Sequence, residues 1–199
     1  MGGNGVECTN ELLFSTETCF KNLSEDTKNT GGKFPVVVWL HGCGGIKKSG
    51  GRWFNEMGYV TVAPDSFSRR GRESACRFTG TFGAGMYQSF RVEEATYARE
   101  HLRKFDWVDQ SKVYLAGLSE GGAAAAQHSG KGYRAKILTG THCRFGLSGP
   151  SEQPVLNLNG RDSHDPGDKA LCGLLGKPQS SAHWVPGADH YVMFNDFAT

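Results

Sequence analysis

The chain has 199 residues, of which 38% are hydrophobic and 21% are charged, so it is long enough for one domain with a substantial core and too short for two of ordinary size. Its 22 basic and 20 acidic residues leave a formal charge of +2, which gives no strongly basic field of the kind that nucleic-acid binding needs. The longest strongly apolar run, residues 35–40, is far below the roughly 20 residues that cross a bilayer. We therefore expect neither a nucleic-acid partner nor a membrane span.

Six cysteines are scattered along the chain, with no C-x-x-C pair and no cluster of zinc-ligand spacing, so we expect no metal site. They are either disulfide-bonded or reduced thiols, and Cys8 with Cys19 is the pair best placed to close a short loop. Residues 1–5 lack the charged and apolar regions of a signal peptide. We expect a secreted or periplasmic mature form, with a cytoplasmic protein as the alternative.

Short apolar runs rich in β-branched and aromatic residues recur along the chain and predict buried strands. These runs are residues 36–40, 59–63, 113–116, 135–138, 155–158 and 182–185. Between the second and third runs, apolar residues recur at helical spacing over 89–105, with Glu and Arg on the other face, which predicts an amphipathic helix. A short Ala-rich helix is expected over 123–128.

Strands that alternate with helices predict an α/β fold, in which a mostly parallel sheet is flanked by helices and sites lie at the carboxyl ends of the strands. We expect residues 35–199 to form this single domain. Residues 1–34 are then an N-terminal extension that leads into the first central strand.

A G-x-S-x-G sequence, Gly117-Leu-Ser-Glu-Gly121, directly follows the third predicted strand and precedes the Ala-rich helix. This order is typical of a nucleophile elbow, in which small residues allow a sharp strand-to-helix turn that exposes the serine hydroxyl. A turn with an incidental serine is the alternative. The context favours Ser119 as a nucleophile.

A serine nucleophile needs a base that is oriented by an acid, and in this arrangement the chain order is Ser, acid, His. Asp162 follows the fifth predicted strand and His190 follows the last, so both lie at carboxyl ends. Asp165 in the same loop is the runner-up for the acid, whereas Asp189 is too close in sequence to orient the ring of His190. We therefore predict a triad of Ser119, Asp162 and His190.

A glycine-rich segment, His41-Gly-Cys-Gly-Gly45, follows the first predicted strand. A turn of this kind can aim a backbone N–H at a developing oxyanion. We assign the first donor to Cys43, with Gly44 as the alternative, and the second to Glu120, the residue after the nucleophile. Cys43 then acts through its backbone, because no base adjoins its thiol. A loop with ordinary turn glycines is the alternative reading.

The sequence resembles the α/β-hydrolases and, within them, the dienelactone hydrolase-like branch of small serine esterases. The motifs that carry the resemblance are residues 41–45, 63–67, 117–121, 160–162 with Pro166, and 188–190. The resemblance implies an α/β-hydrolase fold without a cap domain and with a shortened C-terminal part. It also implies the Ser119, Asp162 and His190 triad, no cofactor, and an ester or lactone substrate. Dienelactone hydrolases proper carry Cys as the nucleophile, so Ser119 favours a general carboxylesterase.

The predicted function is hydrolysis of a small-molecule carboxylic ester through an acyl-enzyme. Short-peptide and polyester hydrolysis use the same chemistry and stay open, as does a non-catalytic binding protein of this fold. Arg70 and Arg72 follow the second predicted strand, where they are candidates to bind a substrate carboxylate. A solvated surface cluster of arginines is the alternative.

Overall fold

The computed structural model describes residues 28–29, 31–46, 49–68, 81–141, 143, 146–164, 171–172 and 177–192. Within them lies one sheet with the strand order β2-β1-β3-β4-β5-β6, in which every neighbouring pair is parallel. The strands are β1 (Phe34–Leu40), β2 (Val60–Val62), β3 (Val108–Leu118), β4 (Lys136–Thr139), β5 (Val155–Gly160) and β6 (Ser181–Val185). All six apolar runs form strands, so the prediction of an α/β fold with a parallel sheet is confirmed.

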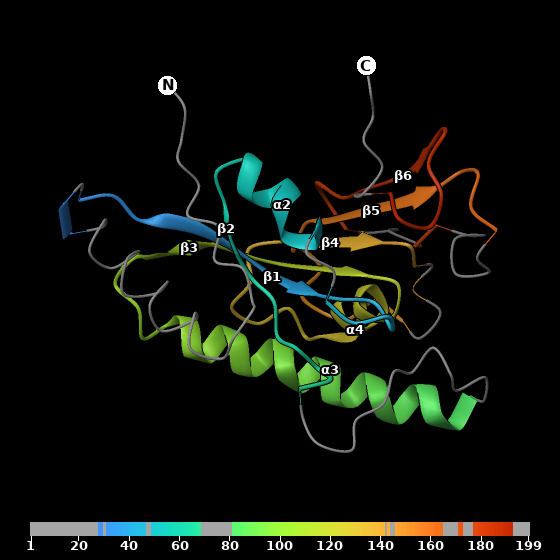
Figure 1. Ribbon diagram of the computed structural model, residues 1–199, viewed down its shortest axis with the longest axis horizontal. Coiled ribbons are helices and arrows are strands. Elements are labelled where there is room, and N and C mark those ends of the chain that lie inside the picture. The colour runs from blue at the N-terminus through green and yellow to red at the C-terminus, as the bar shows by residue number, and fades with distance from the viewer. Residues whose placement is uncertain are drawn as a thin grey trace.

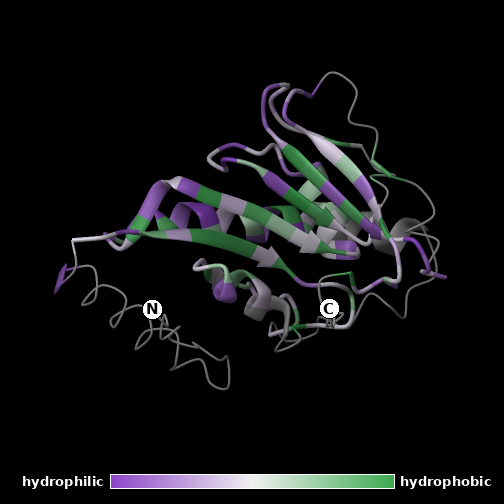
Figure 2. Ribbon diagram, turned by 90° about the horizontal axis from the view of Figure 1, so that it is seen from above, coloured by the Kyte–Doolittle hydropathy of each residue, from purple (hydrophilic) through white to green (hydrophobic). Residues whose placement is uncertain are grey.

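Helices cover both faces of this sheet. They are α2 (Ser49–Glu56), α3 (Thr81–Leu102) and α4 (Glu120–Gln127). The α2 helix lies on one face and α3 and α4 lie on the other (Figures 1 and 2). None of the helices in the described part of the chain is long and apolar enough to cross a membrane.

The helices differ from the sequence prediction in extent. The α3 helix starts eight residues before the predicted position 89 and ends at Leu102 rather than at residue 105, while α4 starts at Glu120 rather than at residue 123. The α2 helix was not predicted, because its first turn contains Ser49 and two glycines, which are weak helix formers.

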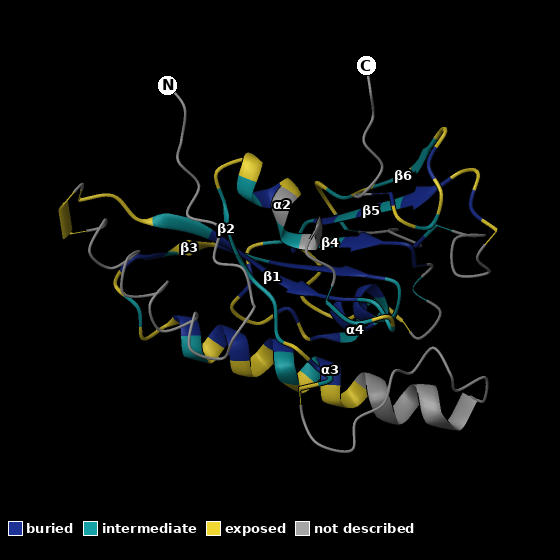
Figure 3. Ribbon diagram, in the orientation of Figure 1, coloured by how far each residue is buried: buried dark blue, intermediate teal, exposed yellow. Residues whose placement is uncertain are grey.

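Side chains alternate along β1 and build an apolar layer on each face of the sheet. Val36, Val38 and Leu40 belong to the core beneath α3 and α4, whereas Val37 and Trp39 belong to the smaller core beneath α2. The centre of the sheet is therefore buried on both sides (Figure 3). This burial explains why β1 has a continuous apolar sequence and why its carboxyl end is held firmly in place.

The register of the strands places the predicted site loops side by side. Leu40 at the end of β1 pairs with Gly117 in β3, and Leu118 pairs with Thr139 at the end of β4. Gly160 at the end of β5 pairs with Val185 at the end of β6. The segments that follow these strands consequently all leave the sheet at the carboxyl ends of its strands.

The predicted polar face of α3 contains two buried arginines. Arg91 and Arg99 are only 2% and 7% exposed. Arg99 donates hydrogen bonds to the carbonyl oxygen of Gly132 and to Oε1 of Gln110. The expectation that arginines fill the solvent face of this helix is wrong at both positions, because protein acceptors there take the place of water.

Lys136 at the start of β4 is fully buried. Its Nζ donates hydrogen bonds to the carbonyl oxygens of Ala126, His128 and Ser148, at 3.2, 2.5 and 2.8 Å. The first two lie at the C-terminal end of α4, where helix carbonyls lack partners within the helix. Burial, with a smaller contribution from Lys177, lowers the pKa of Lys136 to about 7. Lys136 therefore ties the end of α4 to the segment around Ser148.

Replacing Lys136 with Met keeps most of the volume but removes the donor shared by these three carbonyls. Because buried acceptors then lose their partner, we expect Lys136→Met to lower the free energy of unfolding by about 2 to 4 kcal/mol. Urea denaturation at neutral pH measures this loss. The control is Lys112→Met, since Lys112 is 58% exposed; it should change the stability by less than about 0.5 kcal/mol. Equal stability of the two variants would contradict the role assigned to Lys136.

Candidate active site

Ser119 lies in a strained turn between β3 and α4, with φ 56° and ψ −118°. A positive φ is uncommon for a residue with a side chain and persists only where the surroundings enforce it. The Ser119 N–H donates to the carbonyl oxygen of Thr139 at 2.8 Å, and the Ser119 carbonyl accepts from the N–H of Ala123 at 2.9 Å. The Ser119 side chain makes no capping bond to α4. This turn has the geometry of a nucleophile elbow.

The glycines of the G-x-S-x-G sequence permit close contact between backbones. A Cβ on Gly117 would lie 2.3 Å from the carbonyl oxygen of Gly121, and a Cβ on Gly121 would lie 2.1 Å from the carbonyl oxygen of Leu40. Neither position can hold a side chain. The start of α4 can therefore pack directly against the end of β1, which brings Ser119 beside the segment that follows β1.

A pocket opens at the carboxyl ends of β1 and β3. Its lining residues are Trp39, His41, Gly42, Cys43, Gly44, Gly45, Leu118, Ser119, His190 and Tyr191. The structure thus brings three predicted site residues, Ser119, His190 and Cys43, to the walls of one cavity. Trp39 and Leu118 are almost completely buried and form apolar parts of the wall.

His190 reaches this pocket from the segment after β6. A Cβ on Gly140, whose φ is +59°, would lie 2.9 Å from Cε1 of His190, so the imidazole packs closely on the loop that follows β4. Tyr191 packs edge-on against the His190 ring, with the centroids 5.3 Å apart. Tyr191 was not among the site residues predicted from the sequence. The position of Tyr191 next to His190 is the one signal that could have indicated a place at the site.

Asp162 lies in the turn after β5, and its side chain is exposed. Its backbone N–H donates to the carbonyl oxygen of Ala188 at 3.1 Å, which ties this turn to the segment that carries His190. Both residues are described, and no hydrogen bond or ion pair joins the Asp162 carboxylate to the His190 ring. The runner-up Asp165 lies outside the described residues. The identity of the acid stays a prediction.

The segment after β1 presents backbone groups to the pocket. The Gly42 carbonyl oxygen accepts from Nδ1–H of His41 at 2.7 Å and from the N–H of Gly45 at 3.1 Å. Because the peptide is trans and planar, the Cys43 N–H points away from that carbonyl. A Cβ on Gly42 would lie 3.5 Å from Cβ of Ser119, so this peptide is a near neighbour of Ser119.

Cys43 is disulfide-bonded, and its partner lies outside the described residues. A disulfide sulfur is no thiolate nucleophile, which agrees with a role for Cys43 through its backbone. Cys8 and Cys19, the pair favoured from sequence, lie outside the described residues, as do Arg70 and Arg72. Their assignments stay predictions.

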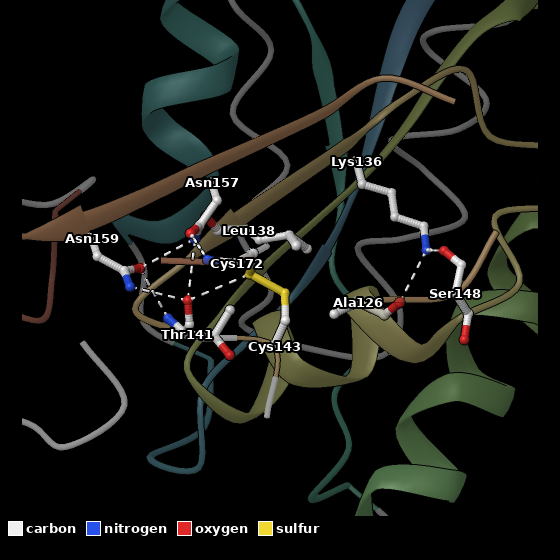
Figure 4. The surroundings of a disulfide bond; sticks show 9 residues. All are labelled: Ala126, Lys136, Leu138, Thr141, Cys143, Ser148, Asn157, Asn159 and Cys172. Carbon is white, nitrogen blue, oxygen red and sulfur yellow. Dashed lines mark hydrogen bonds between the residues drawn. A yellow bond between two sulfur atoms is a disulfide. The ribbon is translucent and has the colours of Figure 1, made fainter. Parts of the chain in front are cut away.

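A second disulfide joins Cys143, after β4, to Cys172, after β5 (Figure 4). Beside it, Asn157 Nδ2 donates to the Thr141 carbonyl oxygen at 3.2 Å, and the Thr141 N–H donates to Oδ1 of Asn159 at 3.1 Å. Both asparagine side chains are completely buried. This cluster fixes the loop after β4, which directly follows Thr139, the residue whose carbonyl oxygen binds the Ser119 N–H.

A buried polar cluster lies on the other side of the elbow. His41 is 1% exposed; its Nε2 accepts from the Ser66 N–H at 3.1 Å, while Nδ1–H donates to Gly42. The Ser66 hydroxyl donates to Glu94, and Arg91 donates to the His41 carbonyl oxygen. Burial raises the pKa of Glu120, which also lies in this cluster.

This cluster was not predicted from the sequence. Arg91 and Glu94 occupy helix positions that the pattern of apolar residues assigned to solvent. Only the packing of α3 against the end of β1 brings them to the site, and no local signal in the sequence indicates that contact.

A parallel sheet with a nucleophile elbow after its third strand and a histidine after its last strand defines an α/β-hydrolase fold. Solved structures share this fold. Esterase PE8 matches with a TM-score of 0.54 and 16% identity over 81% of this chain and 86% of that one. A hyperthermophilic esterase from the archaeon Pyrobaculum calidifontis matches with a TM-score of 0.53 and 15% identity over 89% and 86%. A thermophilic esterase from the Planctomycetes species Thermogutta terrifontis matches with a TM-score of 0.52 and 13% identity over 84% and 76%.

Comparison of the sequence with known protein families identifies the family of this chain. The dienelactone hydrolase family matches residues 22–156, which is more than half of the chain, and the protein belongs to that family. No curated protein matches the sequence. Membership of the family supports a carboxylic ester hydrolase.

Two buried histidines make the stability of the fold depend on pH. His41 uses one ring nitrogen as a donor and the other as an acceptor, so only the neutral ring satisfies both bonds. His128 is arranged in the same way: Nδ1 accepts from the Gly130 N–H, and Nε2 lies 3.1 Å from the Thr96 hydroxyl. Burial, together with Arg91 near His41 and Lys136 near His128, lowers each pKa from 6.5 to about 4.

Both rings bind protons more tightly in the unfolded chain, so their contribution to stability is complete above pH 6.5 and is lost as the pH falls to about 4. We expect about 1 to 3 kcal/mol of loss for each ring. Urea unfolding at pH 7, 5.5 and 4.5 measures the slope, which His128→Asn should reduce. The exposed His183 supplies the control, and His183→Asn should retain the parent slope. A parent protein whose stability is constant over this range would refute the assignment of neutral buried rings.

Proposed function

We propose that the protein is a serine carboxylesterase that hydrolyses small-molecule esters through an acyl-enzyme. The observation that carries the proposal is the position of Ser119 in a strained elbow, on the wall of the same pocket as His190. Strained backbone of this kind is concentrated at functional sites. A turn with an incidental serine would need neither the strain nor the histidine beside it.

In the proposed reaction, His190 takes the proton from Ser119 Oγ as this oxygen bonds to the ester carbonyl carbon. The tetrahedral intermediate collapses, the bond to the alcohol oxygen breaks, and the alcohol leaves with the proton held by His190. Water then attacks the carbonyl carbon of the acyl-enzyme and gives a proton to His190. The bond to Ser119 Oγ breaks, the carboxylic acid is released, and His190 returns the proton to Oγ, which regenerates the Ser119 hydroxyl. Asp162 orients the His190 ring.

The oxyanion of each tetrahedral intermediate accepts hydrogen bonds from the backbone N–H groups of Cys43 and Glu120. Support for Cys43 comes from the orientation of its peptide, whose carbonyl is turned toward His41 and Gly45. Support for Glu120 comes from its place at the first residue of α4, where N–H groups lack helical acceptors and the helix dipole favours negative charge. Loss of one such donor raises the activation free energy by about 3 kcal/mol.

The apolar part of the pocket wall favours a compact acyl group. Trp39 and Leu118 are 2% and 4% exposed and border Ser119 in the pocket, so they can bury hydrocarbon next to the carbonyl carbon. A serine in place of the cysteine nucleophile of the dienelactone hydrolases proper favours ordinary carboxylic esters over dienelactones.

Replacing the nucleophile tests the proposal. We expect Ser119→Ala to lower kcat for p-nitrophenyl acetate by at least about 1,000-fold, since loss of a triad member leaves only a residual rate, and to abolish labelling by a fluorophosphonate probe. Ser151→Ala, at an exposed serine, is the matched control and should retain both activities. Parent-like hydrolysis by Ser119→Ala would rule out the assignment, and a parent protein that resists the probe would indicate a non-catalytic binding protein.

The acid is tested by isosteric substitutions at two aspartates that lie three positions apart in the sequence. We expect Asp162→Asn to lower kcat by at least about 100-fold, because the histidine loses its orienting charge, whereas Asp165→Asn should change kcat less than about threefold. Steady-state kinetics with p-nitrophenyl acetate measure both, with thermal unfolding as a check on folding. The opposite ranking would transfer the role of the acid to Asp165.

A further inference from the structure

Arg91 contacts a residue in each of the two segments to which we assign the oxyanion donors. It projects from α3, is 2% exposed, and donates from Nη2 to the carbonyl oxygen of His41. Its Nη1 lies 3.9 Å from Oε1 of Glu120. The first contact reaches the segment after β1, and the second reaches the first residue of α4.

The contact with His41 acts on the first donor through the backbone. The His41 carbonyl belongs to the peptide that precedes Gly42, and the next peptide carries the Cys43 N–H. The Gly42 carbonyl is in turn fixed by the His41 ring and by Gly45. With both consecutive carbonyls engaged, the direction of the Cys43 N–H is set by planar peptide geometry.

The contact with Glu120 acts on the second donor. Glu120 is 14% exposed, and its Oε1 lies within ion-pair distance of the Arg91 guanidinium. The same residue contributes the backbone N–H that follows the nucleophile. A displacement of the Glu120 backbone would lengthen this ion pair in a poorly solvated site, where an unpaired charge is costly.

Two more residues close a ring of contacts around Arg91. Its Nε lies 3.5 Å from Oε2 of Glu94, Glu94 accepts from the Ser66 hydroxyl, and the Ser66 N–H donates to His41 at 3.1 Å. The chain of contacts returns to the residue whose carbonyl Arg91 binds. A closed ring of buried polar contacts resists displacement more than a single bond does.

We propose that Arg91 is a positioning residue that holds the Cys43 and Glu120 amides in the relative placement needed to bind the oxyanion. This inference rests on the proposed serine-esterase function. Arg91 does not line the pocket that holds Ser119; it acts through the two segments that it contacts. Its effect therefore falls on the tetrahedral transition state and leaves ground-state binding of the ester largely unchanged.

The experiment compares Arg91→Met and Arg91→Lys with Arg99→Met. Arg99 is the matched control, because it is a buried arginine of the same helix whose hydrogen bonds go to Gly132 and Gln110, away from the site. For each variant, kcat and KM for p-nitrophenyl acetate are measured per folded molecule. The inhibition constant of an aryl trifluoromethyl ketone is measured alongside. The serine oxygen adds to the carbonyl carbon of this ketone and forms a tetrahedral oxyanion.

We expect Arg91→Met to lower kcat by about 10- to 100-fold while KM changes less than about threefold. The inhibition constant of the ketone should rise by the same factor by which kcat/KM falls. Arg91→Lys should be intermediate, since an ammonium cannot reach both segments at once. Arg99→Met should retain parent kcat and ketone affinity in its folded fraction. If Arg91→Met does not fold, Arg91→Lys gives the same comparison.

Two results overturn the inference alone. One is parent kcat per folded molecule in both Arg91 variants, and the other is a loss of kcat with unchanged ketone affinity, since either shows that the oxyanion donors are undisturbed. A parent protein that neither hydrolyses the ester nor binds the ketone overturns the proposed function, and this inference with it.

Discussion

The backbone of Ser119, with φ at 56° and ψ at −118°, is the constraint on which the rest of the site depends. A serine does not adopt this conformation without enforcement. Enforcement comes from the bond between the Ser119 N–H and Thr139 and from the contact of Gly121 with the end of β1, where no Cβ fits. The buried centre of the sheet holds β1, β3 and β4 in register, so the strain is maintained by tertiary packing.

Polar clusters support the elbow from two sides and differ in what they control. On the side of β4 and β5, Asn157, Asn159 and the Cys143–Cys172 disulfide fix the loop that follows Thr139 and packs on His190. On the side of α3, the ring around Arg91 reaches the segments on which the proposed oxyanion donors lie. Ser119 and the proposed oxyanion donors thus depend on separate sets of buried contacts, and a substitution can disturb one set without the other.

Much of the fold follows from local sequence, because the buried strands of a parallel sheet need continuous apolar runs. The elbow is predictable for a related reason: Gly117 and Gly121 must be small wherever helix and strand backbones meet this closely. The clusters are not predictable in this way. Arg91 has the helical spacing of a solvent-facing residue, and its burial follows from the packing of α3 on the end of β1, which sequence periodicity does not encode. Tyr191 at the pocket wall was missed although it adjoins His190 in the sequence.

The central claim is that Ser119 carries the acyl group of the substrate during turnover. Rapid acid quenching of the protein with p-nitrophenyl acetate, followed by mass spectrometry of its peptides, tests this claim directly. The account predicts one acetyl group on the peptide that contains Ser119, formed within the first turnover and lost as hydrolysis proceeds. Hydrolysis of the ester with no acetylated peptide at any quench time, or with the acetyl group on another residue, would contradict it.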